Sequence, residues 1–284
     1  MSCYHTDAGN GRRGQDGGRA TARRYSPGWY HCTIHQKDQV NTQFCADQFS
    51  DAYPPGIEQQ YWHLARNRIL EKHLRALRAK RVLDVGCGRG ILVEYLIARG
   101  MDAYGVELAP VKFPGGLESR LFAGVTAESL AESFRTSVDT LVLGDVIEHL
   151  PDPAGYLQRL LSAFERADAL LITVPARQEV WSNYDEYYGH YRRYDLAGLR
   201  ATIMAIGFTP IELGYLFRFL YPPALLLRSL GMQRPVSLAA PRLPFLHRII
   251  ALAMQAEYRL SPRWIPGTSA ICVAVRRGHA PHHQ

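Results

Sequence analysis

A glycine-rich turn follows the apolar run at residues 82–85. The stretch VLDVGCGRG places Gly86, Gly88 and Gly90 at alternate positions, with a carboxylate, Asp84, just before them. Such a turn between a strand and a helix presents backbone N–H groups and the positive end of the helix to a ligand. The third glycine comes one residue too early for the dinucleotide pattern G-x-G-x-x-G. Asp84 would repel a pyrophosphate and attract a cation, so we expect a nucleoside-like ligand that carries an ammonium or sulfonium group and no phosphate.

A second carboxylate supports the same ligand. Glu107 stands 21 residues after Gly86, at the end of the next apolar run, AYGVEL. An acid at this place in a nucleotide-binding α/β unit accepts hydrogen bonds from the ribose hydroxyls. Asp84 and Glu107 together predict S-adenosylmethionine as the cofactor. The alternative to a cofactor site is a tight structural turn with an acid beside it by coincidence.

Two histidines are candidate catalytic residues. His149 lies in DVIEHLPDP, beyond a run that reads as a strand, and His190 lies in the tyrosine-rich loop NYDEYYGHYRRYD. Methyl transfer from a sulfonium is an in-line displacement, which needs a base only when the acceptor is protonated. His149 could equally bond its own turn, and His190 could equally stabilise its own loop. The Glu148–His149 pair has no second carboxylate–histidine cluster near it in sequence, so we expect a metal-independent enzyme.

Aromatic and basic side chains in two segments are candidates for binding the acceptor. A long loop of tyrosines after a strand suits a lid or a substrate wall, and an arginine there could bind a carboxylate or phosphate or pair with a neighbouring acid. The helix-like segment 57–77, which includes Arg66, could close over the cofactor, although core packing would also account for its tryptophan. The substrate candidates are Tyr61, Trp62, Tyr188, Tyr191, Arg192 and Arg193.

Short apolar runs alternate with helical patterns, an order that predicts a mostly parallel sheet covered on both faces. The expected strands are 81–86, 103–108, 137–146, 169–176, 209–217 and 269–277. The expected helices between them are 90–100, 152–164 and 196–208.

Composition divides the chain into three parts. Residues 1–40 lack the apolar centre of a secretory signal and predict a disordered leader. Residues 41–80 predict a helical cover, and residues 81–284 predict the cofactor-binding domain, with a helical, basic insertion at about 217–268. From Leu216 to the end there are nine arginines and one acid, which give this part a charge of about +8. The rest of the chain therefore carries about −1 of the net charge of +7. The insertion either packs over one end of the sheet, or forms a wall for an apolar substrate or a membrane-surface contact.

The remaining bulk features exclude some classes. No run of 18 uncharged apolar residues is present, so a membrane-spanning helix is not expected. Five cysteines without C-x-x-C spacing indicate neither a disulfide framework nor a zinc site. We therefore expect a cytoplasmic protein, with weak membrane-surface contact as a further option.

The motifs VLDVGCGRG, AYGVEL, DTLVLGDVIEHLPDP, LLITVPA and GHYRRYDLAGLRATIMAIGF together resemble the class I S-adenosylmethionine-dependent methyltransferases, and within them the small-molecule branch of quinone-biosynthesis enzymes. The resemblance covers roughly residues 55–217 and the last strand. It implies a Rossmann-like α/β fold with a seven-stranded sheet of order 3-2-1-4-5-7-6, in which the last strand is antiparallel.

The resemblance also implies roles for individual residues. The glycine turn faces the amino-acid part of the cofactor, Glu107 the ribose and Leu108 the adenine. Thr126 stands where the family often has an acid before Ala127, so this chain departs from the pattern there. The residues implied to contact the cofactor are Asp84, Gly86, Cys87, Gly88, Gly90, Glu107, Leu108, Thr126, Ala127, Leu143, Gly144 and Asp145.

Three other functions compete with methyl transfer to an O, N or C atom of a small or lipid-like acceptor. A Rossmann oxidoreductase is disfavoured by the early third glycine, by Asp84 and by the absence of a Y-x-x-x-K pair. A nucleic-acid methyltransferase is disfavoured because Gly144–Ile147 stands where an N/D-P-P-Y/F motif would be, so no nucleic-acid partner is expected. A non-catalytic cofactor-binding or peripheral membrane module remains open.

Overall fold

A seven-stranded sheet organises residues 45–278, the part of the chain that the computed structural model describes. The predicted leader at residues 1–40 lies outside that range. The strand order is β3-β2-β1-β4-β5-β7-β6, which confirms the predicted topology. The strands are β1 (Arg81–Val85), β2 (Asp102–Glu107), β3 (Leu121–Ala123), β4 (Thr140–Gly144), β5 (Ala169–Pro175), β6 (Phe208–Leu216) and β7 (Ser269–Arg276).

The pairing of the strands brings the predicted site residues to one edge of the sheet. β1 pairs in parallel with β2 and β4, so Asp84 lies opposite Gly105 on one side and Val142 on the other. β7 runs antiparallel to both of its neighbours, as predicted. Because parallel strands end at the same edge, the segments that follow β1, β2 and β4 meet there.

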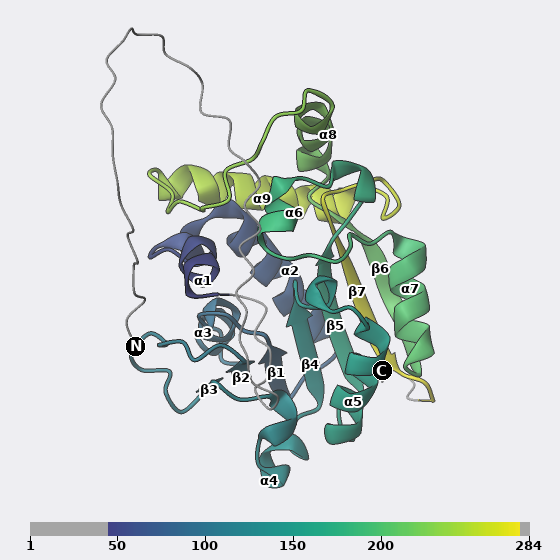
Figure 1. Cartoon of the computed structure of the whole chain (residues 1–284). Coiled ribbons are helices and arrows are strands. Elements are labelled where there is room, and N and C mark those ends of the chain that lie inside the picture. Colours follow the sequence, from purple (N-terminus) through teal and green to yellow (C-terminus); the bar gives the residue numbers. More distant parts are fainter. Residues whose placement is uncertain (1–44, 279–284) are drawn as a thin grey trace, which may run out of the picture. The chain divides into compact units, whose positions relative to one another are not determined.

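Helices cover both faces of the sheet (Figure 1). Alternate strand residues face opposite sides, so that Leu83 and Leu141 belong to one apolar core while Val82 and Val142 belong to the other. The first core is completed by α5 (Pro153–Ala163) and α7 (Leu196–Ala205). The second is completed by α2 (Tyr61–Ala76), α3 (Ile91–Ile97) and α9 (Pro244–Leu260).

Several short elements escaped the sequence analysis. α1 (Ala46–Ala52), α4 (Glu132–Arg135) and α6 (Asn183–Tyr187) span seven residues or fewer, and β3 spans three. A helix of seven residues makes only two turns, which is too few for an apolar stripe to show in the sequence. β3 was expected only through the resemblance.

The insertion between β6 and β7 contains two helices, of which one packs against the rest of the protein and the other has no buried residue. α9 packs on α2 and on the sheet, with the Tyr258 hydroxyl 2.8 Å from Nε2 of His73 and 3.0 Å from the Glu212 carboxylate. α8 (Tyr221–Ser229) has no buried residue. α8 begins only at Tyr221, inside the predicted helical insertion, because Phe217 takes a left-handed conformation with φ 58°. No helix within residues 45–278 is long and apolar enough to cross a membrane.

Candidate functional site

The turn after β1 requires glycine at its first position. Gly86 has φ +75°, and a Cβ there would come within 2.7 Å of Cγ2 of Val146. Gly88 and Gly90 also have positive φ. Gly90 precedes α3, and a Cβ on it would press into Leu121. Glycine at these positions therefore lets the backbone of the turn pass close to Val146 and Leu121 and leaves space for a ligand above the turn.

Asp84 lies beneath this turn, with 4% of its surface exposed. Burial raises the pKa of its carboxyl to about 7; Arg66 opposes the shift, while Glu107 and Asp145 add to it. Three carboxylates thus share this part of the site with one guanidinium. A ligand that brings a positive charge would relieve their mutual repulsion.

Glu107, at the end of β2, is held in place by backbone donors. Its Oε2 accepts from the N–H of Gly88 at 2.9 Å, and its Oε1 accepts from the N–H of Ala109 at 3.0 Å. Burial nevertheless raises the pKa of this carboxyl above its ordinary value. Each oxygen keeps a lone pair for a further donor, such as a ribose hydroxyl.

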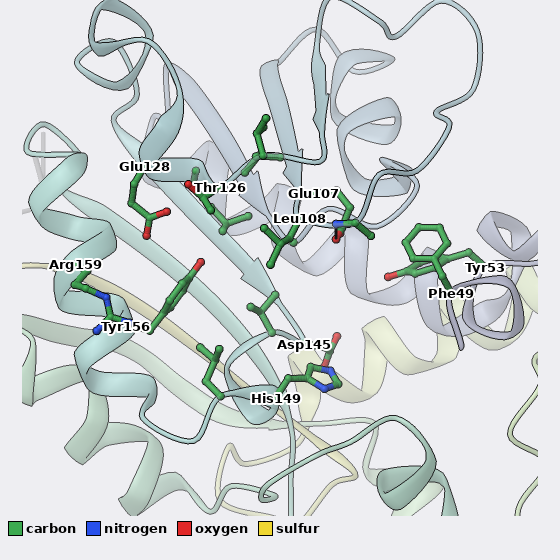
Figure 2. Close-up of a pocket in the computed structure, with 18 residues that line it drawn as sticks. Phe49, Tyr53, Glu107, Leu108, Thr126, Glu128, Asp145, His149, Tyr156 and Arg159 are labelled. Carbon is green, nitrogen blue, oxygen red and sulfur yellow. Dashed lines mark hydrogen bonds between the residues drawn. The ribbon is translucent and has the colours of Figure 1, made fainter. Parts of the chain in front are cut away.

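A first cavity of about 320 Å³ opens over these residues (Figure 2). Glu107 and Leu108 lie between its two ends. Thr126, Glu128 and Tyr156 gather at one end, and Phe49 and Tyr53 of the chain around α1 lie at the other. The cavity is lined by Phe49, Tyr53, Val85, Gly86, Val106, Glu107, Leu108, Ala109, Val125, Thr126, Ala127, Glu128, Asp145, Val146, His149, Leu150, Tyr156 and Arg159.

A second cavity of about 400 Å³ adjoins the first, and Tyr53, Asp145 and His149 line both. Its walls come from segments far apart in the sequence. Aromatic and polar side chains of α2 and of the loop before α7 form one part, and α8 and the segment after it form another. Besides the shared residues it is lined by Ala52, Gln60, Tyr61, Trp62, His63, Arg66, Gly144, Glu148, Pro175, Tyr184, Tyr188, His190, Arg193, Leu220, Pro223, Ala224, Leu227, Arg234, Leu238, Thr268 and Ser269.

Asp145 and Arg66 form an ion pair where the two cavities meet. Nη1 of Arg66 donates to Oδ2 of Asp145 at 2.8 Å, and the guanidinium lies 4.4 Å from the centre of the Trp62 ring. Thr173 also donates to Asp145, at 3.3 Å. Asp145 itself takes a left-handed conformation, φ 59°, which is rare outside glycine and turns the chain sharply after β4. The guanidinium of Arg66 thus lies beside the shared boundary, with its charge balanced by Asp145.

Glu148, His149 and His190 come together at the same boundary. Their candidate ligand atoms all lie within 4.8 Å of one another, and the two imidazole rings meet edge to face with centres 4.7 Å apart. Burial, followed by the nearness of His190, lowers the pKa of His149 to about 3, although the carbonyls of Tyr188 and Gly189 oppose the shift. Burial and the charge of Asp145 raise the pKa of Glu148 well above its usual range. The expectation of metal independence rested on the absence of such a cluster.

His190 is oriented by a buried acid. Its Nδ1 lies 2.8 Å from Oδ1 of Asp185, whose side chain has no exposed surface. Arg193 donates to both Asp185 oxygens, at 2.8 and 3.0 Å, and Ser182 donates its backbone N–H as well. Burial would raise the pKa of Asp185, but His190 and Arg193 outweigh it and lower that pKa to about 2. Arg193 therefore borders the second cavity while its guanidinium is hydrogen-bonded to Asp185.

The predicted site residues separate into those that border a cavity and those that do not. Gly86, Glu107, Leu108, Thr126, Ala127, Asp145 and His149 line the first cavity, and Gly144, Tyr61, Trp62, Tyr188, His190 and Arg193 line the second. Asp84 lies beneath the turn, and Gly88 forms part of it and donates its N–H to Glu107. Cys87, Gly90 and Leu143 pack into the core instead, Tyr191 is largely exposed, and Arg192 donates to the carbonyls of Leu150 and Pro151.

Several cavity residues were missed in the sequence. Tyr53 lies against Gly88, so that a Cβ on Gly88 would overlap the phenol ring of Tyr53. Glu128 lines the first cavity two residues after Thr126, which lacks the expected carboxylate. Tyr156 and Arg159 are three apart on α5 and so share a helix face. That spacing was the one signal available; nothing local pointed to Tyr53.

Comparison with known proteins places the chain in a family. Residues 61–213, more than half of the chain, match the family model described as a methyltransferase domain. The chain belongs to this methyltransferase family. Membership confirms the resemblance drawn from the sequence and S-adenosylmethionine as the cofactor.

Individual relatives of this methyltransferase resemble it only in part. The ubiquinone biosynthesis O-methyltransferase of Paracidovorax citrulli is 38% identical over 93 residues, 30% of this chain and 39% of that protein. The protein of the same description from Hahella chejuensis is 42% identical over 89 residues, 29% of this chain and 37% of that protein. The chain thus spans about two fifths of these curated relatives. A solved plantazolicin methyltransferase, BpumL, aligns over 82% of this chain and 88% of its own at 12% identity and a TM-score of 0.49, too weak a likeness to carry an argument.

Proposed function

We propose that this protein transfers a methyl group from S-adenosylmethionine to an oxygen, nitrogen or carbon atom of a small or lipid-like acceptor. One observation carries the proposal: two adjoining cavities share Tyr53, Asp145 and His149. The first has the carboxylates and the glycine turn that suit a cationic nucleoside, and the second has room for another molecule. The bound cofactor would supply an electrophilic methyl group, and the protein would align the acceptor with it.

The residues present fit the cofactor. The carboxylate of Glu107 is fixed by two backbone donors and can accept from ribose hydroxyls. Asp84 offers a negative charge beneath the turn, and Arg66 offers a positive one that a ligand carboxylate would share with Asp145. Glu128 can accept from an adenine amine in place of the acid that Thr126 lacks. Polar recognition is thus available for the sugar, the base and both charges of the amino acid.

The acceptor side combines apolar walls with a few polar groups. The second cavity is bordered by apolar residues of the insertion, Leu220, Pro223, Ala224 and Leu227, as well as by Trp62 and the two histidines. This arrangement suits a molecule with an apolar body and one reactive polar end. Because His149 borders both cavities and His190 borders the second, we propose that the two histidines orient that polar end toward the methyl group.

The insertion supports a lipid-like acceptor taken from an anionic membrane surface. α8, the residue that caps it and α9 leave large apolar side chains exposed: Leu225, Leu226, Leu230, Phe245, Leu246, Ile249 and Leu252. Exposed arginines lie among them: Arg228, Arg234, Arg242, Arg248 and Arg259. The one acid of the segment, Glu257, is buried against the backbone N–H of Arg218. Apolar side chains amid uncompensated positive charge match the interface of an anionic bilayer.

Isothermal titration with S-adenosylhomocysteine, with NADH as the comparison ligand, tests the proposed function. We expect micromolar binding of S-adenosylhomocysteine, none of NADH, and loss of binding in Glu107→Ala. NADH binding, or no binding of either ligand, would contradict the proposal and favour the dinucleotide or non-catalytic alternative.

A further inference from the structure

One buried carboxylate in the site has no partner that accounts for it. Glu148 has no exposed surface, and neither of its side-chain oxygens accepts a hydrogen bond from another residue in the described range 45–278. Within that range, its own backbone N–H is the one donor that favours the ionised carboxylate. The nearest group able to carry a positive charge is His149, with Nε2 at 3.9 Å from Oε1. A buried carboxylate normally pairs with a cation or coordinates a metal, because isolation in the interior is costly.

The arginines close to Glu148 are committed elsewhere. Arg193 donates to both oxygens of Asp185 and to the carbonyl of Ala176. Arg66 donates to Asp145. Neither guanidinium therefore bonds to Glu148, and Arg193 acts on it only as a nearby charge.

Two imidazoles stand beside this carboxylate in an arrangement suited to a metal. His190 is held by Asp185 through Nδ1, which leaves Nε2 for another ligand. A carboxylate that fixes the far nitrogen of a histidine is the usual second layer of a metal site, since it sets the tautomer and the ring orientation. Asp185 is itself held by Arg193 and Ser182, so His190 is a preorganised ligand.

We propose that Glu148, His149 and His190 bind a divalent cation at the boundary of the two cavities. Their ligand atoms lie within 4.8 Å of one another. Two imidazole nitrogens and one carboxylate hold zinc in other enzymes, and they leave coordination positions open for water or a substrate oxygen. The site replaces our expectation of a metal-independent enzyme.

The position of the cation gives it a use, which rests on the proposed function. An acceptor hydroxyl that reaches an open coordination position loses its proton to solvent more readily. Its oxygen then forms a bond to the methyl carbon as the sulfur–carbon bond breaks, and S-adenosylhomocysteine leaves. The histidines then act through the cation and do not themselves remove the proton.

Manganese binding measured by electron paramagnetic resonance tests the site independently of activity. The chain also carries His279, His282 and His283 near its end, so the reference protein has all three replaced by asparagine. After chelator treatment and dialysis, we expect this reference protein to bind one Mn²⁺ per chain, and Zn²⁺ to displace it. Glu148→Gln and His190→Ala should each remove saturable binding. Asp185→Asn should weaken it by about 10- to 100-fold, as loss of an orienting partner does.

Folding and cofactor binding are measured on the same samples. The reference protein should gain thermal stability on addition of Mn²⁺, and Glu148→Gln should not. No saturable Mn²⁺ or Zn²⁺ binding by the reference protein, or equal binding by Glu148→Gln and His190→Ala, would overturn the metal site. If S-adenosylhomocysteine still binds in that case, the metal proposal alone falls. If it does not bind while Mn²⁺ does, the proposed function falls and the metal site stands.

Discussion

The two cavities that meet at Asp145 are built by different means. The first rests on the ends of β1 and β2, where backbone N–H groups fix Glu107 and positive φ values shape the turn at Gly86. The second is bounded by α2, α6 and the insertion, which are joined mainly by side-chain bonds. One such link is the reciprocal pair between Asn183 and the backbone of Arg234, at 2.8 and 2.9 Å. The sheet edge thus supplies a rigid half-site, and the added segments supply a half-site that can differ without altering the sheet.

This difference predicts that changes in the first half act on cofactor affinity, and that changes in the second act on the acceptor or its source. The following predictions test that division, beginning with the largest expected effect.

Glu107→Ala should weaken S-adenosylhomocysteine binding by about 100-fold or more, because it removes a carboxylate acceptor from both ribose hydroxyls and charged hydrogen bonds contribute about 1.5–3 kcal/mol each. Glu118→Ala is the matched control, since Glu118 is an exposed acid on the segment after the same strand. Isothermal titration measures both. Equal affinity in the two variants would mean that the ribose does not lie at Glu107.

Cofactor affinity should fall as the pH falls through 7. Burial, together with Glu107 and Asp145 and against the effect of Arg66, raises the pKa of the Asp84 carboxyl to about 7, and a cationic ligand favours its ionised form. Between pH 8 and pH 6 the affinity should drop by about tenfold, the change in the ionised fraction of such a group. The raised pKa also means that this group's contribution to stability is present below pH 4 and lost as the pH rises through 7.

Asp84→Asn provides the control for this prediction. The variant should bind S-adenosylhomocysteine more weakly at pH 8, with little change in affinity between pH 6 and pH 8. A wild-type affinity that is independent of pH, or an unchanged pH dependence in Asp84→Asn, would remove Asp84 from the account of cofactor binding.

Leu226→Glu combined with Ile249→Glu should reduce binding to vesicles of phosphatidylcholine with phosphatidylserine by roughly tenfold, since it removes two exposed apolar side chains and adds negative charge. Met204→Glu is the control, an exposed apolar residue on α7. Co-sedimentation reports the bound fraction, and titration with S-adenosylhomocysteine should give the same affinity for all three proteins. No binding of the wild type to anionic vesicles would exclude the membrane surface.

Gly86→Ala and Gly100→Ala separate backbone strain from steric contact in the first half. Both glycines have φ +75°, but a Cβ meets Val146 at 2.7 Å in the first case and nothing within 4 Å in the second. Both variants should lose about 1–2 kcal/mol from the left-handed conformation. Only Gly86→Ala should lose further stability and, by about threefold, cofactor affinity. Equal thermal unfolding of the two variants would argue against the close contact at Gly86.

The first half could largely be predicted from the sequence, since its residues lie within a few positions of strand ends. Asp84, Gly86 and Glu107 follow directly from VLDVGCGRG and AYGVEL once the strands are parallel neighbours. The departure at Thr126 was visible too, whereas Glu128 beside it was not recognised.

The second half could be predicted only in part, because long-range folding assembles it: several of its lining residues were candidates in the sequence, but their grouping was not. Tyr53 reaches Gly88 from a short helix that has no periodic signal. His190 reaches Glu148 and His149 across 41 residues, through a loop whose course depends on Asp185 and Arg193. A local pattern cannot show which of several tyrosines, histidines and arginines in such a loop will turn inward.

A crystal structure with S-adenosylhomocysteine tests the central claim most directly. We predict that the ligand occupies the first cavity, with its ribose hydroxyls within hydrogen-bonding distance of Glu107 and its sulfur facing the second cavity at Tyr53, Asp145 and His149. A ligand bound elsewhere, or one whose sulfur is turned away from the second cavity, would contradict the assignment of one cavity to the cofactor and the other to the acceptor.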